Sequence, residues 1–290
     1  MISLIFAILC SSCIFVIFKL FERYKIDVFQ AIVFNYFTAF LCGILLYGNE
    51  WKPSALNNIT WFYYAIVAAI LFISLFILMG LSSQRNGVAI TSVAVKMSMA
   101  ASVLGMIFIY NESVSLLKVG GISFAFAGVV LVSWQKNGSG IKKQGQSLWM
   151  LLVLFFGSGI LDLVLNYVQN NELKVLTPSL FSAFGFGMAG IIGLVVFLFQ
   201  LQQKKARFGF KNVLGGIALG IPNYFSIYLL IKSYEETGWT DSTVIAIINV
   251  SIVCIAALTG FLIFKEKLNL TKGLGIVASL LAILMLYIAS

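Results

Sequence analysis

The sequence is divided into apolar segments that are long enough to cross a lipid bilayer. A helix of about 20 apolar residues spans a hydrocarbon core of about 30 Å. Breaks rich in charged residues, Gly, Asn and Pro separate ten such segments, at residues 2–19, 27–47, 60–81, 88–110, 115–134, 147–168, 178–201, 209–231, 243–264 and 271–288. Only 10% of the residues are charged, against about 25% in soluble domains. We therefore predict an all-α integral membrane protein with ten transmembrane helices.

The ten segments form two groups of five on either side of a polar linker. The predicted repeats are residues 1–135 and 147–290, and the linker is residues 136–146. Because each group holds an odd number of spans, the second group must enter the membrane in the opposite direction to the first. The sequence thus predicts two inverted five-helix repeats, an architecture typical of secondary transporters whose site lies near the membrane midplane.

A shift of 154 residues reveals the similarity between the two groups. It places Glu112 on Glu266 and Gly121 on Gly275, and it gives 7 identities in the 19 positions from 104 to 122 without gaps. Identities between apolar residues are common by chance in such a chain. The shared glutamate and glycine therefore carry most of the evidence for an internal duplication.

Small residues form a stripe on the last helix of each predicted repeat. They lie at matching positions, namely Gly121, Ala125 and Gly128 in the first repeat and Gly275, Ser279 and Ala282 in the second. Stripes of this kind let membrane helices approach each other closely. One interpretation is a homodimer that forms through Gly121 and Ala125 together with Gly275 and Ser279.

The two segments at residues 88–132 and 243–286 each contain an apolar helix, a short loop with a glutamate and a final helix that bears glycine. In this pattern the chain resembles the EamA-like branch of the drug/metabolite transporter superfamily. The resemblance implies ten helices in two halves and transport of a small metabolite. Family members often carry a proline where this chain has Met99 and Val253. We therefore expect the hinge at Pro222, next to Gly220, because proline removes a helical hydrogen bond.

Two charged residues lie inside predicted spans, Lys96 and Asp162. A charge at lipid depth is costly and marks a functional site by default. If both face one cavity, they either bind the carboxylate and the ammonium of an amino acid-like solute or pair with each other and gate access. A buried structural pair, or a lysine that extends to the interface, is the alternative.

The predicted sixth helix carries a polar stripe. Ser158, Asp162, Asn166 and Asn170 are four residues apart, which places them on one face of a helix. We expect this face to line a substrate cavity.

Three asparagines also lie inside spans, Asn35, Asn223 and Asn249. Each either lines the cavity or forms an interhelical hydrogen bond, of which the second is the more common role. Glu112 and Glu266 lie in short turns, where we expect them to fix the loop geometry.

Composition excludes several kinds of chemistry. The chain has no histidine, so it has neither a histidine zinc site nor a Ser-His-Asp triad, and it lacks the phosphate-binding loop of ATPases. We predict no cofactor, no metal and no enzymatic activity, since one lysine and one aspartate are weak support for an intramembrane enzyme. The basic residues lie in loops between apolar segments, which does not indicate nucleic acid binding.

The function that these patterns favour is secondary transport of a small metabolite, such as an amino acid-like solute, by alternating access. A membrane scaffold or receptor-like protein that transports nothing is the alternative. The partners expected are a small-molecule substrate and the lipid of the plasma or inner membrane. If the N-terminus lies outside, 14 of the 19 Lys and Arg residues fall in cytoplasmic loops, as the positive-inside rule favours. The family resemblance implies the opposite orientation.

Overall fold

The fold of the chain is known from a computed structural model, which describes residues 1–50, 60–110, 114–134, 141–171, 177–204, 207–239, 241–266 and 269–289. The α-helices are α1 (Ile2–Arg23), α2 (Val28–Tyr47), α3 (Thr60–Arg85), α4 (Val88–Lys96), α5 (Ser98–Tyr110), α6 (Leu116–Ser133), α7 (Ile141–Asn171), α8 (Pro178–Gln202), α9 (Phe210–Thr237), α10 (Asp241–Leu262) and α11 (Leu270–Ala289). A short 3-10 helix, η1 (Gly48–Glu50), follows α2.

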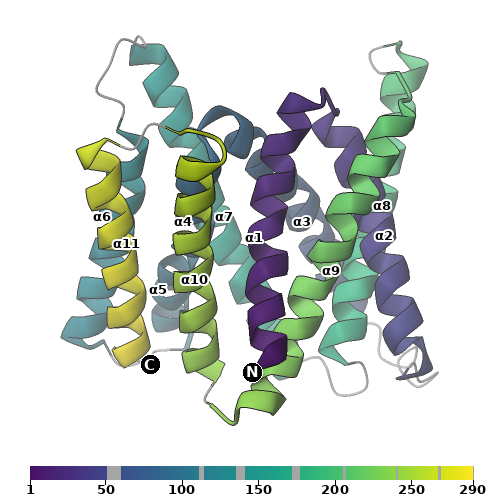
Figure 1. Cartoon of the computed structure of the whole chain (residues 1–290). Helices are drawn as coiled ribbons and strands as arrows, with labels where there is room; N and C mark the ends of the chain where they lie inside the picture. Colours follow the sequence, from purple (N-terminus) through teal and green to yellow (C-terminus); the bar gives the residue numbers. More distant parts are fainter. Residues whose placement is uncertain are drawn as a thin grey trace.

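Ten helical spans of 18 to 26 residues are long and apolar enough to cross a membrane. No strand occurs in these ranges, and the helices stand side by side as a bundle (Figure 1). The predicted all-α membrane fold is therefore confirmed. The chain is a multi-pass membrane protein.

Polar residues at helix starts explain several of the boundaries. The side chains of Asp27, Ser115 and Thr177 accept hydrogen bonds from backbone N–H groups three residues further along the chain. These N–H groups have no partner within the helix, so such caps stabilise the first turn. Pro178 occupies the first helical position of α8, as predicted, because its missing N–H costs nothing there.

The structure differs from the sequence prediction in two places. The fourth span is two helices, because α4 ends at Lys96 and α5 begins at Ser98, with Met97 in a turn between them. The helix α7 starts at Ile141, within the predicted linker, although its apolar span, Leu148–Val168, agrees with the predicted segment. The division into two repeats stays a prediction, and Glu112 lies outside the described residues.

Eight of the spans form a closed ring of neighbouring helices. Its order is the broken span α4 and α5, then α7, α3, α8, α2, α9, α1 and α10, which packs against α4 again. The helices α6 and α11 pack on each other beside this ring. The ring is also symmetric with respect to the two groups of five spans. If each span is exchanged for the span five positions away in the chain, every pair of neighbours in the ring remains a pair of neighbours. Two related five-helix halves would produce this symmetry.

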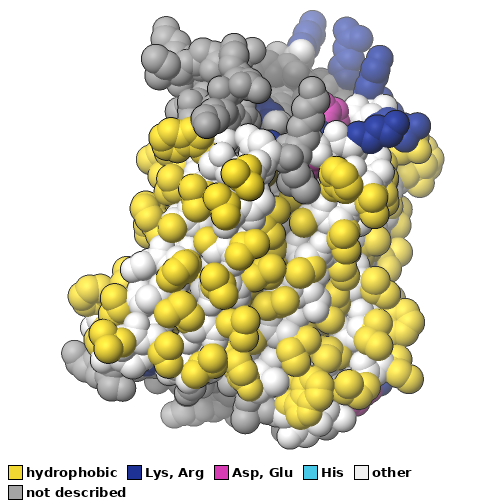
Figure 2. Space-filling model, turned by 60° about the vertical axis from the view of Figure 1, so that its left-hand side comes forward, with side chains coloured by type: hydrophobic (Ala, Val, Ile, Leu, Met, Phe, Trp, Pro, Cys, Tyr) yellow, Lys and Arg dark blue, Asp and Glu magenta, His cyan; other side chains and the backbone are white. Residues whose placement is uncertain are grey.

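The two ends of the bundle differ in charge. Both chain termini lie at one end, at the bottom of Figure 1, which we call the termini end. Lys and Arg side chains gather at the opposite end (Figure 2), which we call the basic end. At the termini end, the Ser3 hydroxyl of α1 donates a hydrogen bond of 2.7 Å to Glu236 of α9, and this bond lowers the pKa of the Glu236 carboxyl.

The small residues of α6 and α11 face each other within the chain. A Cβ atom added to Gly121 would lie 2.7 Å from Leu286, and one added to Gly275 would lie 2.8 Å from the backbone nitrogen of Val132. Gly121, Ala125, Gly275 and Ser279 are all buried. The close approach that we predicted therefore occurs, but inside one molecule. The homodimer that the sequence suggested through these four residues stays a prediction.

Glycines also bring α2 and α9 together. A Cβ atom at Gly216 would lie 2.6 Å from the carbonyl oxygen of Ala31, and one at Gly220 would lie 2.6 Å from that of Asn35. Because the opposing atoms belong to backbone, no side-chain movement can make room for them. The two glycines thus set the distance between α2 and α9.

Candidate functional site

The ring of helices encloses a cavity of about 620 Å³. Its lining comes from both halves of the chain, with residues from every helix except α1 and α6. Apolar and aromatic side chains make up most of the wall, and a few polar side chains interrupt it. This combination of size and composition is typical of pockets that bind small molecules.

The cavity extends from the middle of the bundle to the termini end. Tyr234, Ile245 and Tyr287 line it close to the ends of α9, α10 and α11 at that side. Toward the basic end, α4 contributes to the lining only from Val95 onward and α9 only from Asn223 onward. The cavity therefore reaches closer to the termini end than to the basic end.

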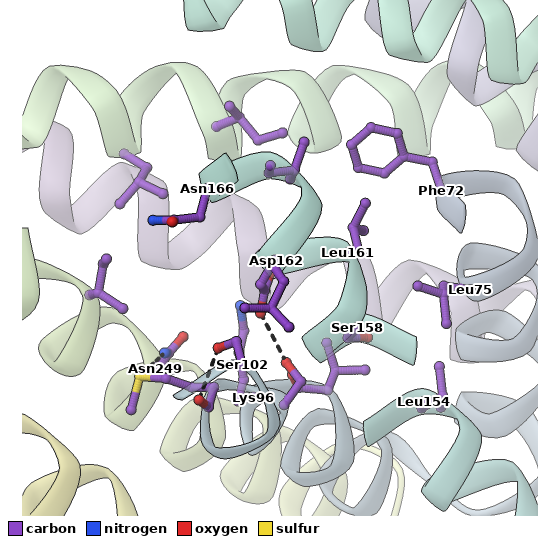
Figure 3. Close-up of a pocket in the computed structure, with 18 of the residues that line it drawn as sticks. Phe72, Leu75, Lys96, Ser102, Leu154, Ser158, Leu161, Asp162, Asn166 and Asn249 are labelled. Carbon is purple, nitrogen blue, oxygen red and sulfur yellow. Dashed lines mark hydrogen bonds between the residues drawn. The ribbon is translucent and has the colours of Figure 1, made fainter. Parts of the chain in front are cut away.

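Lys96 and Asp162 both line this cavity. Lys96 is the last residue of α4, and Asp162 lies in the middle of α7. Their side chains point toward each other from neighbouring helices (Figure 3). The opposite charges attract each other, yet they are absent from the direct ion pairs of the described residues. The two charged groups are therefore neighbours in the cavity without a direct ion pair.

A single serine supports the aspartate. The Ser98 hydroxyl lies 3.3 Å from the Asp162 carboxylate and 2.7 Å from the carbonyl oxygen of Val95, so it shares its proton between two acceptors. No other hydrogen bond to this carboxylate, and none from the Lys96 ammonium, is found within the part of the chain that the structure describes. Both charged groups therefore keep hydrogen-bonding capacity for a ligand.

The interruption at Met97 lies between Lys96 and Ser98, two residues of this site. On its two sides the span has different neighbours, because α4 packs against α10 while α5 packs mainly against α7. Met97 itself keeps helical dihedral angles, and its N–H still donates a hydrogen bond to the carbonyl oxygen of Val93. The interruption is therefore slight, and Asn249 of α10 lines the cavity beside it.

The polar stripe of α7 lines the cavity as a row. Ser158, Asp162 and Asn166 all belong to the lining and follow one another along the helix in Figure 3. The side chain of Asn170, the fourth member of the predicted stripe, lies outside the described residues. A substrate in the cavity would thus meet three polar groups on one helix face.

The three predicted asparagines occupy different depths. Asn249 lines the cavity, and its amide nitrogen lies 3.7 Å from the sulfur of Met99. Asn223 lines it too, and its amide donates a hydrogen bond of 3.3 Å to Asn35. Asn35 is fully buried behind Asn223 and outside the cavity lining. For Asn35 the structure shows an interhelical hydrogen bond rather than a direct place in the lining, and the binding roles of all three stay predictions.

Several lining residues have no signal in the sequence. Four aromatic residues form one wall of the cavity, namely Tyr36, Phe72, Phe76 and Phe186. Tyr36 stacks on Phe186, and their ring centroids lie 5.7 Å apart. Aromatic residues occur throughout the spans, and many of them are exposed on the outer surface of the bundle. Composition alone does not distinguish a residue that faces the cavity from one that faces lipid.

The expected hinge in α9 is not visible as a break. The helix runs without interruption through Pro222, and Gly220 is packed against α2. The interruption lies instead at Met97, in the span where the family pattern has a proline. A hinge role for Pro222 and Gly220 stays a prediction, because one conformation does not test it.

Glu266 connects the two halves at the basic end. Its carboxylate accepts a hydrogen bond of 2.8 Å from the backbone N–H of Val88, at the start of α4. A negative charge at a helix N-terminus is favourable. Gly87 and Gly260 leave room for the carboxylate, since a Cβ atom on either would come within 2.7 Å of it. Glu266 therefore fixes its loop, as predicted, and also holds that loop to α4.

A second connection between the halves lies at the same end. The Asn212 amide of α9 donates a hydrogen bond of 2.8 Å to Gln30 of α2, and the Gln30 amide donates one of 2.8 Å to the carbonyl oxygen of Arg207. The backbone N–H of Asp27 donates to the Asn212 side chain at 3.0 Å. These bonds and the Glu266 contact close the basic end. As for metals, the described residues hold no group of three side chains suited to bind one.

Comparisons with known proteins agree with this architecture. The model of the EamA-like transporter family matches residues 145–288, which correspond to the second half of the chain. A Haemophilus influenzae protein, described only as uncharacterized, is 30% identical over 295 residues, which cover 98% of this chain and 97% of that protein.

A solved crystal structure is similar in fold. It has a TM-score of 0.64 and 14% sequence identity, over 99% of this chain and 96% of the other. An identity this low shows a shared fold and nothing about substrate. Together with ten apolar spans, the family match leads to one conclusion: the chain belongs to the EamA-like transporter family, within the drug/metabolite transporter superfamily.

Proposed function

We propose that this chain is a secondary transporter that moves a small zwitterionic metabolite, of the amino acid type, across the plasma or inner membrane by alternating access. The observation that carries the proposal is that Lys96 and Asp162 line one cavity and form no direct ion pair with each other. A ligand carboxylate would bind the Lys96 ammonium, and a ligand ammonium would bind the Asp162 carboxylate. Each charge would then have a partner at lipid depth, where an uncompensated charge is costly.

The surrounding wall supports a ligand with an apolar side chain. Phe72, Leu75 and Leu161 line the same cavity as the charged pair (Figure 3). A zwitterion alone would leave this surface in contact with water. An apolar side chain that covers the wall would gain about 25 cal/mol for each Å² removed from water.

The test is counterflow in vesicles that contain the purified chain. Unlabelled L-amino acid inside should drive uptake of the same labelled amino acid, and vesicles without the chain should show none. As competitors, matched analogues that lack one charge should fail, namely the N-acetyl derivative without the ammonium and the amide without the carboxylate. Competition as strong as that of the parent amino acid would contradict recognition of a zwitterion.

The alternating-access part of the proposal uses the difference between the two ends. The cavity reaches closer to the termini end, and the bonds that Glu266 and Asn212 form between the two halves lie at the basic end. With the basic end in the cytoplasm, as the positive-inside rule favours, the cavity faces outward. Transport then requires the basic end to open while the termini end closes.

We expect Glu266→Ala to open the basic end more often. Loss of a hydrogen bond to a charged group costs about 1.5–3 kcal/mol, which corresponds to at least about a tenfold shift in a closing equilibrium. A cysteine at position 102, within the cavity, would report this opening in a chain whose four native cysteines are replaced. Its labelling by a membrane-impermeant maleimide from the basic side should rise by about tenfold.

Glu22→Ala is the matched control, because Glu22 is an exposed carboxylate at the same end that pairs only with Lys19. This variant should label as the parent does. Glu266→Gln should lie between parent and Glu266→Ala, since its amide oxygen still accepts the bond from Val88. Unchanged labelling in Glu266→Ala would show that this contact does not hold the basic end closed.

A further inference from the structure

Two buried polar groups beside the cavity have no hydrogen-bond partner among the residues that the structure describes. They are the hydroxyl of Tyr36 and the amide nitrogen of Asn35, both on α2 and both in residues that are 0% exposed. Polar groups that are buried in proteins are nearly always hydrogen-bonded, because leaving one unpaired costs free energy. Two neighbouring residues that each bury an unpaired polar group are therefore unusual in a folded protein.

Both groups belong to the polar layer on the α2 and α9 side of the cavity. Tyr36 is part of the lining itself. Asn35 lies one layer behind and accepts a hydrogen bond from Asn223, which also lines the cavity. In the ring of helices, α2 and α9 lie across from the broken span that carries Lys96. The unpaired groups thus lie on a different wall from the charged pair.

The ring of Tyr36 is held in place by aromatic neighbours. Its centroid lies 5.6 Å from that of Phe76 and 5.7 Å from that of Phe186, and Phe186 in turn lies 5.0 Å from Phe72. Contacts on both sides keep the ring from moving away to find another partner. The hydroxyl is therefore presented at a fixed position, which is how a specific recognition group is built.

We propose that Tyr36 and Asn223, with Asn35 holding Asn223 from behind, form a second subsite that binds an oxygen atom at the far end of the substrate side chain. Because the Tyr36 hydroxyl can donate a hydrogen bond, the matching group is an acceptor, such as a carbonyl, carboxylate or hydroxyl oxygen. This inference rests on the proposed function, since Lys96 and Asp162 would bind the zwitterionic end. The substrate class is thereby narrowed to amino acid-like solutes with a polar tip.

The test compares Tyr36→Phe with the parent on ligand pairs of similar shape. L-tyrosine differs from L-phenylalanine by one hydroxyl. L-asparagine and L-leucine are similar in shape, but the side chain of asparagine ends in a polar amide and that of leucine in two methyl groups. The parent should bind the polar-tipped member of at least one pair about tenfold more tightly, because a site with hydrogen-bonding groups rejects the analogue that lacks a partner. Tyr36→Phe should reduce that preference by about tenfold while the affinity for the apolar member stays the same.

Thermal unfolding of the ligand-free protein gives a second readout. Removal of an unpaired hydroxyl breaks no bond, so the Tm of Tyr36→Phe should equal or exceed that of the parent. A Tm several degrees lower would show that the hydroxyl is bonded within the protein and would overturn the subsite. Tyr63→Phe is the control, because Tyr63 is 62% exposed on α3 and outside the cavity lining.

The outcomes separate this inference from the proposed function. If the parent transports amino acids but Tyr36→Phe keeps the same ligand preference, the subsite is wrong and the proposed function stands. If Tyr36→Phe weakens both members of a pair equally, its role is structural and the subsite is again wrong. If the parent binds none of the four amino acids, the proposed function fails, and the subsite fails with it.

Discussion

Asp162→Asn should lower amino acid counterflow by about thirtyfold or more, because the carboxylate is proposed to bind the ammonium of the substrate. Truncating one partner of a buried charge pair costs about 2–5 kcal/mol, and every 1.4 kcal/mol is a factor of ten. The substitution keeps the shape of the side chain, and its amide oxygen can still accept the bond from Ser98. The loss would therefore report the charge rather than the fold.

Three comparisons make this experiment specific. Lys96→Met should show a loss of similar size, because it removes the opposite charge and keeps an unbranched side chain. Asp162→Glu should restore part of the activity. Glu22→Gln, at the exposed basic end, should transport as the parent does. Rates at the parent level in both Asp162→Asn and Lys96→Met would refute the assignment of the binding site.

Gly220→Ala should destabilise the protein by disrupting the contact between α2 and α9. The added methyl group would lie 2.6 Å from the carbonyl oxygen of Asn35 and 2.6 Å from the Cβ atom of Thr38. Overpacking of this kind costs about 1–3 kcal/mol or more, and in a chain of this size we expect a Tm lower by about 5 °C. Gly216→Ala should behave alike. Thermal unfolding in detergent measures both.

Gly273→Ala is the matched control for these two variants. Gly273 is also helical, in α11, but a Cβ atom there meets nothing within 4 Å. Alanine is favoured over glycine inside helices, so its Tm should be equal or slightly higher. An unchanged Tm in Gly220→Ala would mean that α2 can move away from α9 at little cost.

Much of the fold is predictable from the sequence, because the bilayer imposes length and polarity on each span. The ten segments were found from apolar length and loop charge alone. The break at Met97 was missed, since neither proline nor glycine marks it. The small-residue stripes of α6 and α11 correctly indicated a close helix contact, but a stripe does not say whether its partner lies in the same chain.

The candidate site is predictable where the cost of burial is high. Lys96 and Asp162 were selected because charges rarely face lipid, and the structure brings both into one cavity. The sequence does not identify Tyr36 and the phenylalanines around it as site residues, because aromatic side chains occur both on lipid-facing surfaces and in cavity walls. Similarly, Asn35 differs from Asn223 and Asn249 only by its depth, which depends on how the helices rotate against each other.

The interruption at Met97 has no equivalent in the counterpart span, because α10 runs unbroken from Asp241 to Leu262. A carrier with two identical halves would rest with the same energy whether it faced one compartment or the other. Here one half contains this interruption and the counterpart helix is continuous, so the two halves are not equivalent. Under the proposed alternating access, we expect the empty protein to face one compartment more often than the other.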